Sequence, residues 1–330
     1  MRWEDDTSVG SWIRERLDHD PTTMHTVVPR GFEAYARIFH PARVRSLVGG
    51  GVVPTSDELR AMADDEFDRT VASFRDEVAT WTDTAAAFGT VLHPLAQWNR
   101  IVRTPQGEDW RSRRSPDGRE FSAPIEGDLP PEILAHAAEH LVAHTTTPDD
   151  GIAGLWGGWG GLLGGYGPAG RVFLTATGDP AEAHAAMLAE SIHDPFNNPY
   201  QKAVWHDGIL PREISEGAHL ELPQREHVLF TAPPRAFADP DWVAFVPWSD
   251  PSTGSGIGHE ERGVAPMAQH PSLIWPADRA WILVSEIDFD STVVAGSAPL
   301  IAALCADERI DALPLTEGAN LQWDADELNR

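Results

Sequence analysis

The sequence predicts an α+β fold, with a mixed or antiparallel sheet and packed helices forming a single large domain. Strand-like and helix-like segments are interspersed without the regular βαβ repeat of a doubly wound sheet. The composition, 42% hydrophobic and 23% charged, is ordinary for a globular chain. A chain of 330 residues can bury a large core without disulfides, and its single cysteine, Cys305, excludes an intramolecular one. We therefore expect residues 1–330 to form one domain.

The N-terminal third of the sequence predicts helices separated by one strand. Residues 9–17 predict a short helix. Apolar and polar side chains alternate with a period of two within residues 31–40, which is typical of a strand, and Pro41 ends it. Ser56 is a candidate N-cap for the next helix, and a further helix is predicted over residues 70–88.

Residues 103–131 contain five prolines and three glycines among charged side chains, which predicts a long loop or linker. A loop of this length inside a compact domain is uncommon, so we expect it either to carry function or to be mobile. A helix is predicted over residues 131–144, because proline is favoured in the first turn of a helix.

The second half of the sequence predicts short strands, two helices and a glycine-rich loop. The helices are predicted at 180–191 and 297–306, and the loop at 252–259, where no helix follows that could bind a phosphate. The predicted strands are 171–176, 227–231, 242–246, 281–287 and 313–315.

Charge and hydropathy exclude several classes of partner. The chain has 51 acidic and 25 basic residues, for a net charge of −26. This charge repels polyanions, so we expect no binding to nucleic acid or to membranes. No segment has the roughly 18 to 20 continuous apolar residues that span a bilayer, and the acidic N-terminal segment is not a secretory signal. With a single cysteine, these features predict a cytoplasmic protein.

A segment rich in glycine and aromatic residues, residues 151–170, contains the candidate binding residues Trp156, Trp159 and Tyr166. Glycine permits close approach of the backbone, and aromatic rings can stack on a flat ligand. The alternative interpretation is a pair of tightly packed strands or turns. The 13 tryptophans of the chain favour a binding surface, although a role in the core explains tryptophan equally well.

The sequence His136-Ala137-Ala138-Glu139-His140 matches the H-x-x-E-H pattern of inverted zinc peptidases. On a helix, His136 and His140 lie one turn apart and could bind one zinc ion, with Glu139 as general base. The third ligand would come from Glu213, Glu216 or Glu221, of which we take Glu216 as the candidate. The alternative is an amphipathic helix whose histidines border its apolar face, with Glu139 directed away from them.

A second polar cluster combines Asp278 and Arg279, which we take as candidate binding residues, with Glu286, Asp288 and Asp290. The last three alternate along a predicted strand, which would place three carboxylates on one face. Such a face could bind a divalent cation through oxygen ligands. The alternatives are a solvated strand end or an ion pair with Arg279.

Three stretches of the sequence resemble an uncharacterised family of acidic, tryptophan-rich bacterial proteins. They are residues 31–41 (GFEAYARIFHP), residues 273–281 (LIWPADRAW) and the segment around Glu286, Asp288 and Thr292. The resemblance implies one unit over the whole chain and implies no activity.

The function expected from the sequence is binding without catalysis, of an unknown protein or small molecule and without a cofactor. The alternative is a zinc-dependent hydrolase built on His136, Glu139 and His140.

Overall fold

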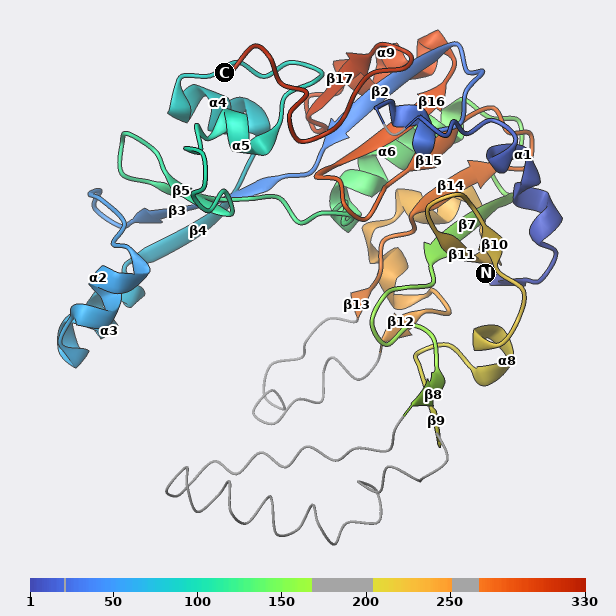
Figure 1. Ribbon diagram of the computed structural model, residues 1–330, viewed down its shortest axis with the longest axis horizontal. Helices are drawn as coiled ribbons and strands as arrows, with labels where there is room; N and C mark the ends of the chain where they lie inside the picture. The colour runs from blue at the N-terminus through green and yellow to red at the C-terminus, as the bar shows by residue number, and fades with distance from the viewer. Residues whose placement is uncertain (21, 168–203, 251–266) are drawn as a thin grey trace, which may run out of the picture. The chain divides into compact units, whose positions relative to one another are not determined.

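The computed structural model describes residues 1–20, 22–167, 204–250 and 267–330 (Figure 1). It divides into two compact units, a larger one of residues 1–156 and 219–330 and a smaller one of residues 157–218. Antiparallel sheets with packed helices confirm the predicted α+β class, and the single domain stays a prediction. The strand predicted at 171–176, the helix at 180–191 and the loop at 252–259 lie outside the described residues.

The larger unit is built on a nine-stranded antiparallel sheet. Its order is β1-β11-β7-β14-β15-β16-β2-β17, and β10 also pairs with β11. Strands β14, β15 and β16 are buried at every position and β2 at all but its first, because these strands are covered on both faces. The strands are Arg2–Glu4 (β1), Ala34–Phe39 (β2), Gly151–Trp156 (β7), Leu220–Glu221 (β10), Glu226–Thr231 (β11), Leu273–Pro276 (β14), Ile282–Val284 (β15), Ser291–Gly296 (β16) and Ala312–Leu315 (β17).

Two helices, α6 (Pro131–Ala143) and α9 (Ala298–Ala306), contact each other on one side of this sheet. The apolar positions of α6 repeat at helical spacing and are buried. The indole of Trp281, just before β15, donates a hydrogen bond of 2.8 Å to the carbonyl of Leu141 in α6. This bond joins the helix to the middle of the sheet.

Alternate side chains of the same strands form a second core on the opposite face. There the short helices η1 (Thr7–Gly10), α1 (Ser11–Arg14) and η2 (Met24–Thr26) close over the sheet. Trp12 of α1 meets Trp275 of β14 edge to face, with ring centroids 6.1 Å apart.

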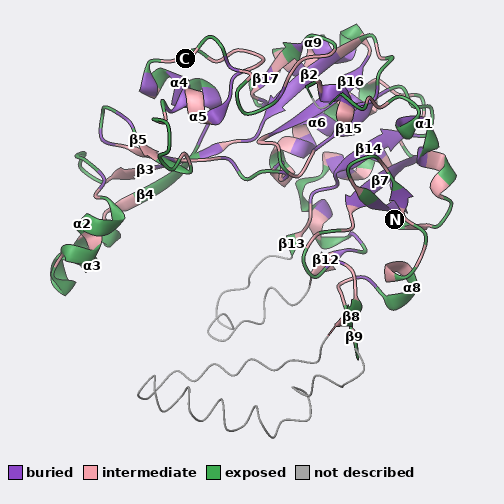
Figure 2. Cartoon of the chain, viewed as in Figure 1, coloured by how far each residue is buried: buried purple, intermediate pink, exposed green. Residues whose placement is uncertain are grey.

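A four-stranded sheet of order β4-β3-β6-β5 continues from β2. Its core packs on α4 and α5 around Phe39, Trp81 and Trp98. Between β3 and β4 lie two short helices, α2 and α3, in which no residue is buried (Figure 2). The elements are Ala42–Leu47 (β3), Ser56–Ala61 (α2), Asp64–Ala72 (α3), Phe74–Ala79 (β4), Trp81–Phe88 (α4), Trp98–Ile101 (α5), Ser112–Arg114 (β5) and Glu120–Ser122 (β6).

The remaining described elements are short. The 3-10 helices η4 (Pro234–Ala238) and η5 (Pro240–Ala244) contact α6. A two-stranded ribbon pairs β12 (Ser249–Asp250) with β13 (Met267–Ala268). In the smaller unit, β8 (Gly165–Gly167) pairs with β9 (Val204–His206), and α8 covers Arg212–Ser215.

Most predicted elements are confirmed. Helix is found at the start of residues 9–17, and α6 and α9 match the helices predicted at 131–144 and 297–306. The strands β2, β11 and β17 match those predicted within 31–40 and at 227–231 and 313–315. The long loop or linker predicted at residues 103–131 is wrong in part, because this segment contains the hairpin of β5 and β6, joined by a turn in which Gly118 N donates to Ser115 O.

Three predicted elements are wrong in whole or in part, each for a local reason. Residues 74–79 form β4 rather than part of a helix, because they pair with β3 and Thr80 then caps a new helix. The strand predicted at 242–246 is not found; residues 240–244 form a 3-10 helix instead, because Asp239 caps its start ahead of Pro240. The strand predicted at 281–287 ends at Val284, and a turn follows. The N-cap of α2 is Thr55 rather than Ser56.

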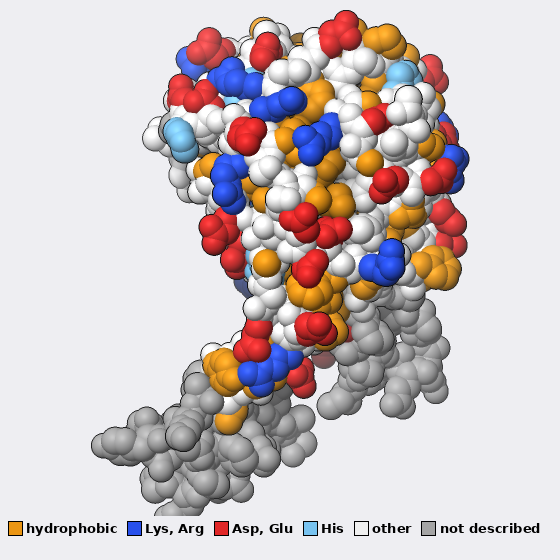
Figure 3. Space-filling view, turned by 90° about the vertical axis from the view of Figure 1, so that its right-hand side faces the viewer, with side chains coloured by type: hydrophobic (Ala, Val, Ile, Leu, Met, Phe, Trp, Pro, Cys, Tyr) orange, Lys and Arg blue, Asp and Glu red, His pale blue; other side chains and the backbone are white. Residues whose placement is uncertain are grey.

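No helix in the described part of the chain is long and apolar enough to cross a membrane. Figure 3 shows acidic side chains scattered over one face, with arginines among them.

Candidate functional site

The three aromatic residues predicted to bind a partner belong to different units. Trp156 ends β7 in the larger unit and is half-buried, with the guanidinium of Arg225 5.2 Å from its ring centroid. Trp159 and Tyr166 belong to the smaller unit, where the side chain of Tyr166 is exposed.

Within the smaller unit, Tyr166 packs edge to face on Trp205 at 5.4 Å. The guanidinium of Arg212 lies over both rings, 4.5 Å from that of Trp205 and 5.3 Å from that of Tyr166. Glu216, predicted as a zinc ligand in the alternative hypothesis, forms an ion pair of 2.9 Å with Arg212. These contacts make a compact surface cluster in which the aromatic rings already have a cation.

The predicted binding residues Asp278 and Arg279 form a turn between β14 and β15. The carboxylate of Asp278 accepts hydrogen bonds from Thr145 Oγ1 at 2.8 Å and from Thr146 N at 2.7 Å. Arg279 has a positive φ of 55°, and its guanidinium lies 5.5 Å from the Trp12 ring. Neither residue lines the pocket described below.

The H-x-x-E-H segment lies on α6 as predicted, and two of its three polar side chains point to the segment after α9. His140 Nε2 is 2.8 Å from Asp307 Oδ2, and Glu139 pairs with Arg309 at 2.8 Å. The hydrogen bond from Arg309 lowers the pKa of Glu139. In the described residues, no group of three His, Cys, Asp or Glu side chains could hold a metal ion. The local geometry is that of a polar seam between α6 and the turn after α9.

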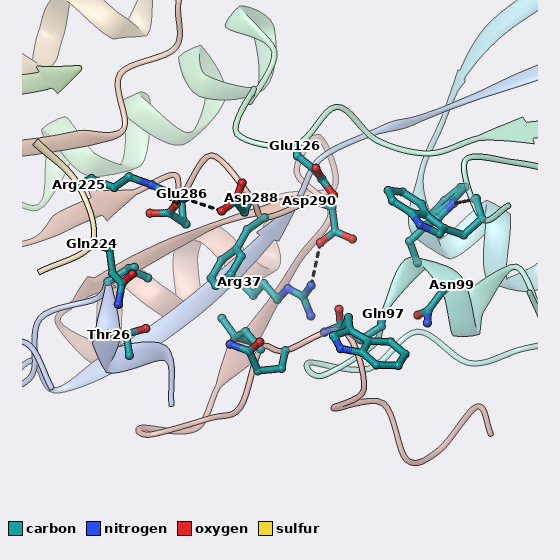
Figure 4. A pocket seen from close by; sticks show the side chains of 17 residues that line it. Thr26, Arg37, Gln97, Asn99, Glu126, Gln224, Arg225, Glu286, Asp288 and Asp290 are labelled. Carbon is teal, nitrogen blue, oxygen red and sulfur yellow. Dashed lines mark hydrogen bonds and ion pairs between the residues drawn. The ribbon is translucent and has the colours of Figure 1, made fainter. Parts of the chain in front are cut away.

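A pocket of about 490 Å³ opens in the larger unit beside the turn between β15 and β16 (Figure 4). Strand β2, the segment before α5, the turn between β15 and β16 and the segment of residues 321–323 all contribute to its wall. The charged lining residues are four acids and two arginines, namely Glu126, Glu286, Asp288, Asp290, Arg37 and Arg225. The aromatic and amide lining residues are Trp98, Trp110, Phe289, Trp323, Gln97, Asn99, Gln224 and Gln322.

Arg37 forms the floor of the pocket and is 1% exposed. Its Nε donates to Ser291 Oγ at 2.8 Å, and its Nη2 donates to Asp290 Oδ1 at 3.0 Å (Figure 4). Its Nη1 donates to the carbonyls of Pro94 and Ala96. Burial lowers the pKa of this guanidinium, and the charge of Asp290 opposes that effect. The pair therefore fixes β2 to the start of β16 and to the segment before α5.

Arg225 holds the opposite side of the pocket. It pairs with Glu286 at 3.0 Å and with Asp288 at 2.5 Å. Burial raises the pKa of Glu286, and the positive charge of Arg225 limits that rise. Because the same guanidinium lies over Trp156, the predicted binding residue supports the pocket wall without lining it.

Two of the pocket's polar groups without a partner in the described part of the chain bear on binding, one of them buried and one exposed. Gln97 is 6% exposed, and its amide Nε2 is buried without a hydrogen bond. Glu126 is exposed and lines the pocket, and its carboxylate has no hydrogen bond or ion pair with the described residues; partial burial and the nearby charges of Asp290 and Asp288 raise its pKa. The pocket thus offers an unused buried donor and an unused carboxylate acceptor.

The last wall of the pocket is the segment that contains Leu321 and Trp323. Buried Asp326 anchors this segment, because its carboxylate contacts His93 Nε2 at 2.8 Å and accepts from Gln97 N at 3.3 Å. Burial of Asp326 opposes ionisation, but hydrogen bonds from Asn329 and His93 lower its pKa overall.

Sequence reasoning identified part of this pocket. It grouped Glu286, Asp288 and Asp290, but these lie in a turn rather than on a strand face, and their cations are Arg225 and Arg37 rather than Arg279. It missed Gln97 and Glu126. An arginine in the middle of the apolar strand β2 was the available signal for Arg37.

Comparison of the chain with protein-family models, curated proteins and solved structures gave no match. The resemblance to acidic, tryptophan-rich bacterial proteins therefore stays a prediction.

Proposed function

We propose that this protein binds a small polar ligand in the pocket beside the turn between β15 and β16, without a catalytic step. The observation that carries this proposal is the buried, unpartnered amide Nε2 of Gln97 in the wall of an open pocket. A buried donor without a partner costs about 1 to 3 kcal/mol, which a ligand that accepts its hydrogen bond would offset. Glu126 provides a complementary acceptor in the same pocket.

The rest of the lining supports this function. Ligand pockets combine apolar and aromatic walls with a few fixed polar groups, and here the indoles of Trp98 and Trp110 accompany carboxylates and amides. The carboxylate of Asp290 is held in position by buried Arg37, so the polar groups are arranged before a ligand arrives. The volume of about 490 Å³ is within the range for a small molecule rather than a protein segment.

A panel of monosaccharides, amino acids, amino alcohols and amines tests this function by thermal shift and titration calorimetry. We expect at least one compound to bind the wild-type protein. Gln97→Leu, which keeps the side-chain size and removes the amide, should weaken that binding about tenfold, because one hydrogen bond to the ligand is lost.

Tyr166→Ala is the matched control, because Tyr166 belongs to the aromatic cluster of the smaller unit. We expect its affinity to equal that of the wild type. If Tyr166→Ala lost binding while Gln97→Leu kept it, the ligand site would belong to the smaller unit and the proposal would be wrong. Failure of the whole panel to bind would also count against it.

A further inference from the structure

We propose that the ligand of this pocket is a small organic cation, an ammonium or guanidinium compound that also offers an oxygen acceptor. The inference rests on the proposed function, and it specifies the chemical class of the ligand. It starts from the charge of the lining, where four carboxylates and two guanidiniums give a net charge of −2.

The two arginines of the pocket are already engaged, so an anionic ligand would find little to bind. Arg37 uses all three of its nitrogens in contacts with Ser291, Asp290 and two backbone carbonyls. Arg225 is shared between Glu286 and Asp288. The net charge of −26 on the chain would also disfavour the approach of an anion.

The carboxylate of Glu126 is the position left for a cation. It lies near Asp290, whose Oδ1 accepts a hydrogen bond from Arg37 Nη2 (Figure 4). Partial burial, together with the proximity of Asp290 and Asp288, disfavours the charge of Glu126, and Arg111 compensates only in part. A ligand cation near Glu126 and Asp290 would relieve this repulsion.

Two further features favour an organic cation over a metal ion. The described residues contain no group of three side chains arranged to hold a metal. Instead, the pocket has indole rings from Trp98 and Trp323, and indole faces attract organic cations; the third indole, Trp110, already has the guanidinium of Arg111 4.8 Å from its ring centroid. The unpartnered Nε2 of Gln97 requires an acceptor on the same ligand, such as a hydroxyl or carbonyl oxygen.

Pairs of probes that differ in charge test this inference by titration calorimetry at low ionic strength. Glucosamine is compared with glucose, and choline with its neutral carbon isostere dimethylbutanol. We expect the cation of a pair to bind about tenfold or more tightly than its neutral partner. Glu126→Gln should remove this preference while leaving the affinity for the neutral probe unchanged.

Glu132→Gln is the matched control, because Glu132 is exposed on α6 outside the pocket and carries the same charge change. It should keep the preference for the cation. Circular dichroism checks that the variants fold. Equal or tighter binding of the neutral probes would overturn this inference and leave the pocket as a binding site, whereas no binding of any probe would overturn the proposed function with it.

Lowering the pH provides a second readout. Because the pKa of Glu126 is raised, its proton uptake begins at a higher pH than for an ordinary glutamate. The affinity for the cation should be constant around neutral pH and should fall as Glu126 becomes protonated. Glu126→Gln should lose this part of the pH dependence, and a pH profile identical to that of the wild type would contradict the role of Glu126.

Discussion

Single buried side chains account for much of the chemistry of this protein. Arg37 remains inside the unit because each of its nitrogens has an acceptor. Three buried histidines, His40, His227 and His270, differ from Arg37 because their rings are neutral. Burial lowers the pKa of His40 and His227 to about 4 and that of His270 to about 3. These rings resist protonation in the folded chain.

The three histidines predict a loss of stability in mild acid. In the unfolded chain they take up protons near pH 6.5, whereas in the folded chain they stay neutral until about pH 4 or below. The stability is therefore complete above pH 6.5 and falls between there and pH 4, by about 1.4 kcal/mol per pH unit for each histidine. Urea unfolding measured at intervals between pH 7 and pH 5 checks this expectation.

His270→Leu isolates one of the three contributions, because leucine has a similar size and does not titrate. The urea midpoint of this variant, relative to that of the wild type, should rise as the pH falls from 7 to 5. Parallel curves for the two proteins would mean that His270 takes up its proton in the folded state.

At the scale of elements, variants at the polar seam between α6 and the turn after α9 distinguish a structural role of the H-x-x-E-H segment from a zinc site. If the role is structural, His140→Ala should lower stability by about 1 to 2 kcal/mol, because it removes the contact with Asp307. His136→Ala should cost less, since His136 Nδ1 has no hydrogen bond. Urea unfolding of both variants, with and without EDTA, measures this difference.

A zinc site would give another pattern. Both histidine variants would then be equally harmful, EDTA would destabilise the wild type alone, and elemental mass spectrometry would find about one zinc per chain. That result would restore the hydrolase hypothesis.

An element could be predicted from the sequence when the interactions that form it lie within its own segment. Helix α6 was predictable because its apolar period and Pro131 act within the segment itself. Strand β4 was not, because Phe74–Ala79 becomes a strand only by pairing with β3, a distant part of the sequence. The pocket followed the same rule. The three acids near residue 288 are close in sequence and were grouped, whereas Arg37, Gln97 and Glu126 meet them only through the fold.

At the scale of the whole molecule, the net charge of −26 opposes compactness through self-repulsion. Adding NaCl from low concentration to about 0.5 M shortens the Debye length to a few ångströms and screens this repulsion. We therefore expect the melting temperature to rise by a few degrees, measured by differential scanning fluorimetry, with sucrose of equal osmolality as the control for non-ionic effects. A fall with salt would mean that surface ion pairs such as Arg45 with Asp76 outweigh the repulsion.

Strand β2 has a further consequence for how the chain acquires its shape during synthesis. Its neighbours in the sheet are β16 and β17, and Arg37 bonds to Ser291, 254 residues later. At roughly 5 to 20 residues per second, a ribosome needs about 10 to 50 seconds to make that stretch. During that time both edges of the apolar strand β2 remain unpaired. We expect the nascent chain to depend on a ribosome-associated chaperone until β16 emerges.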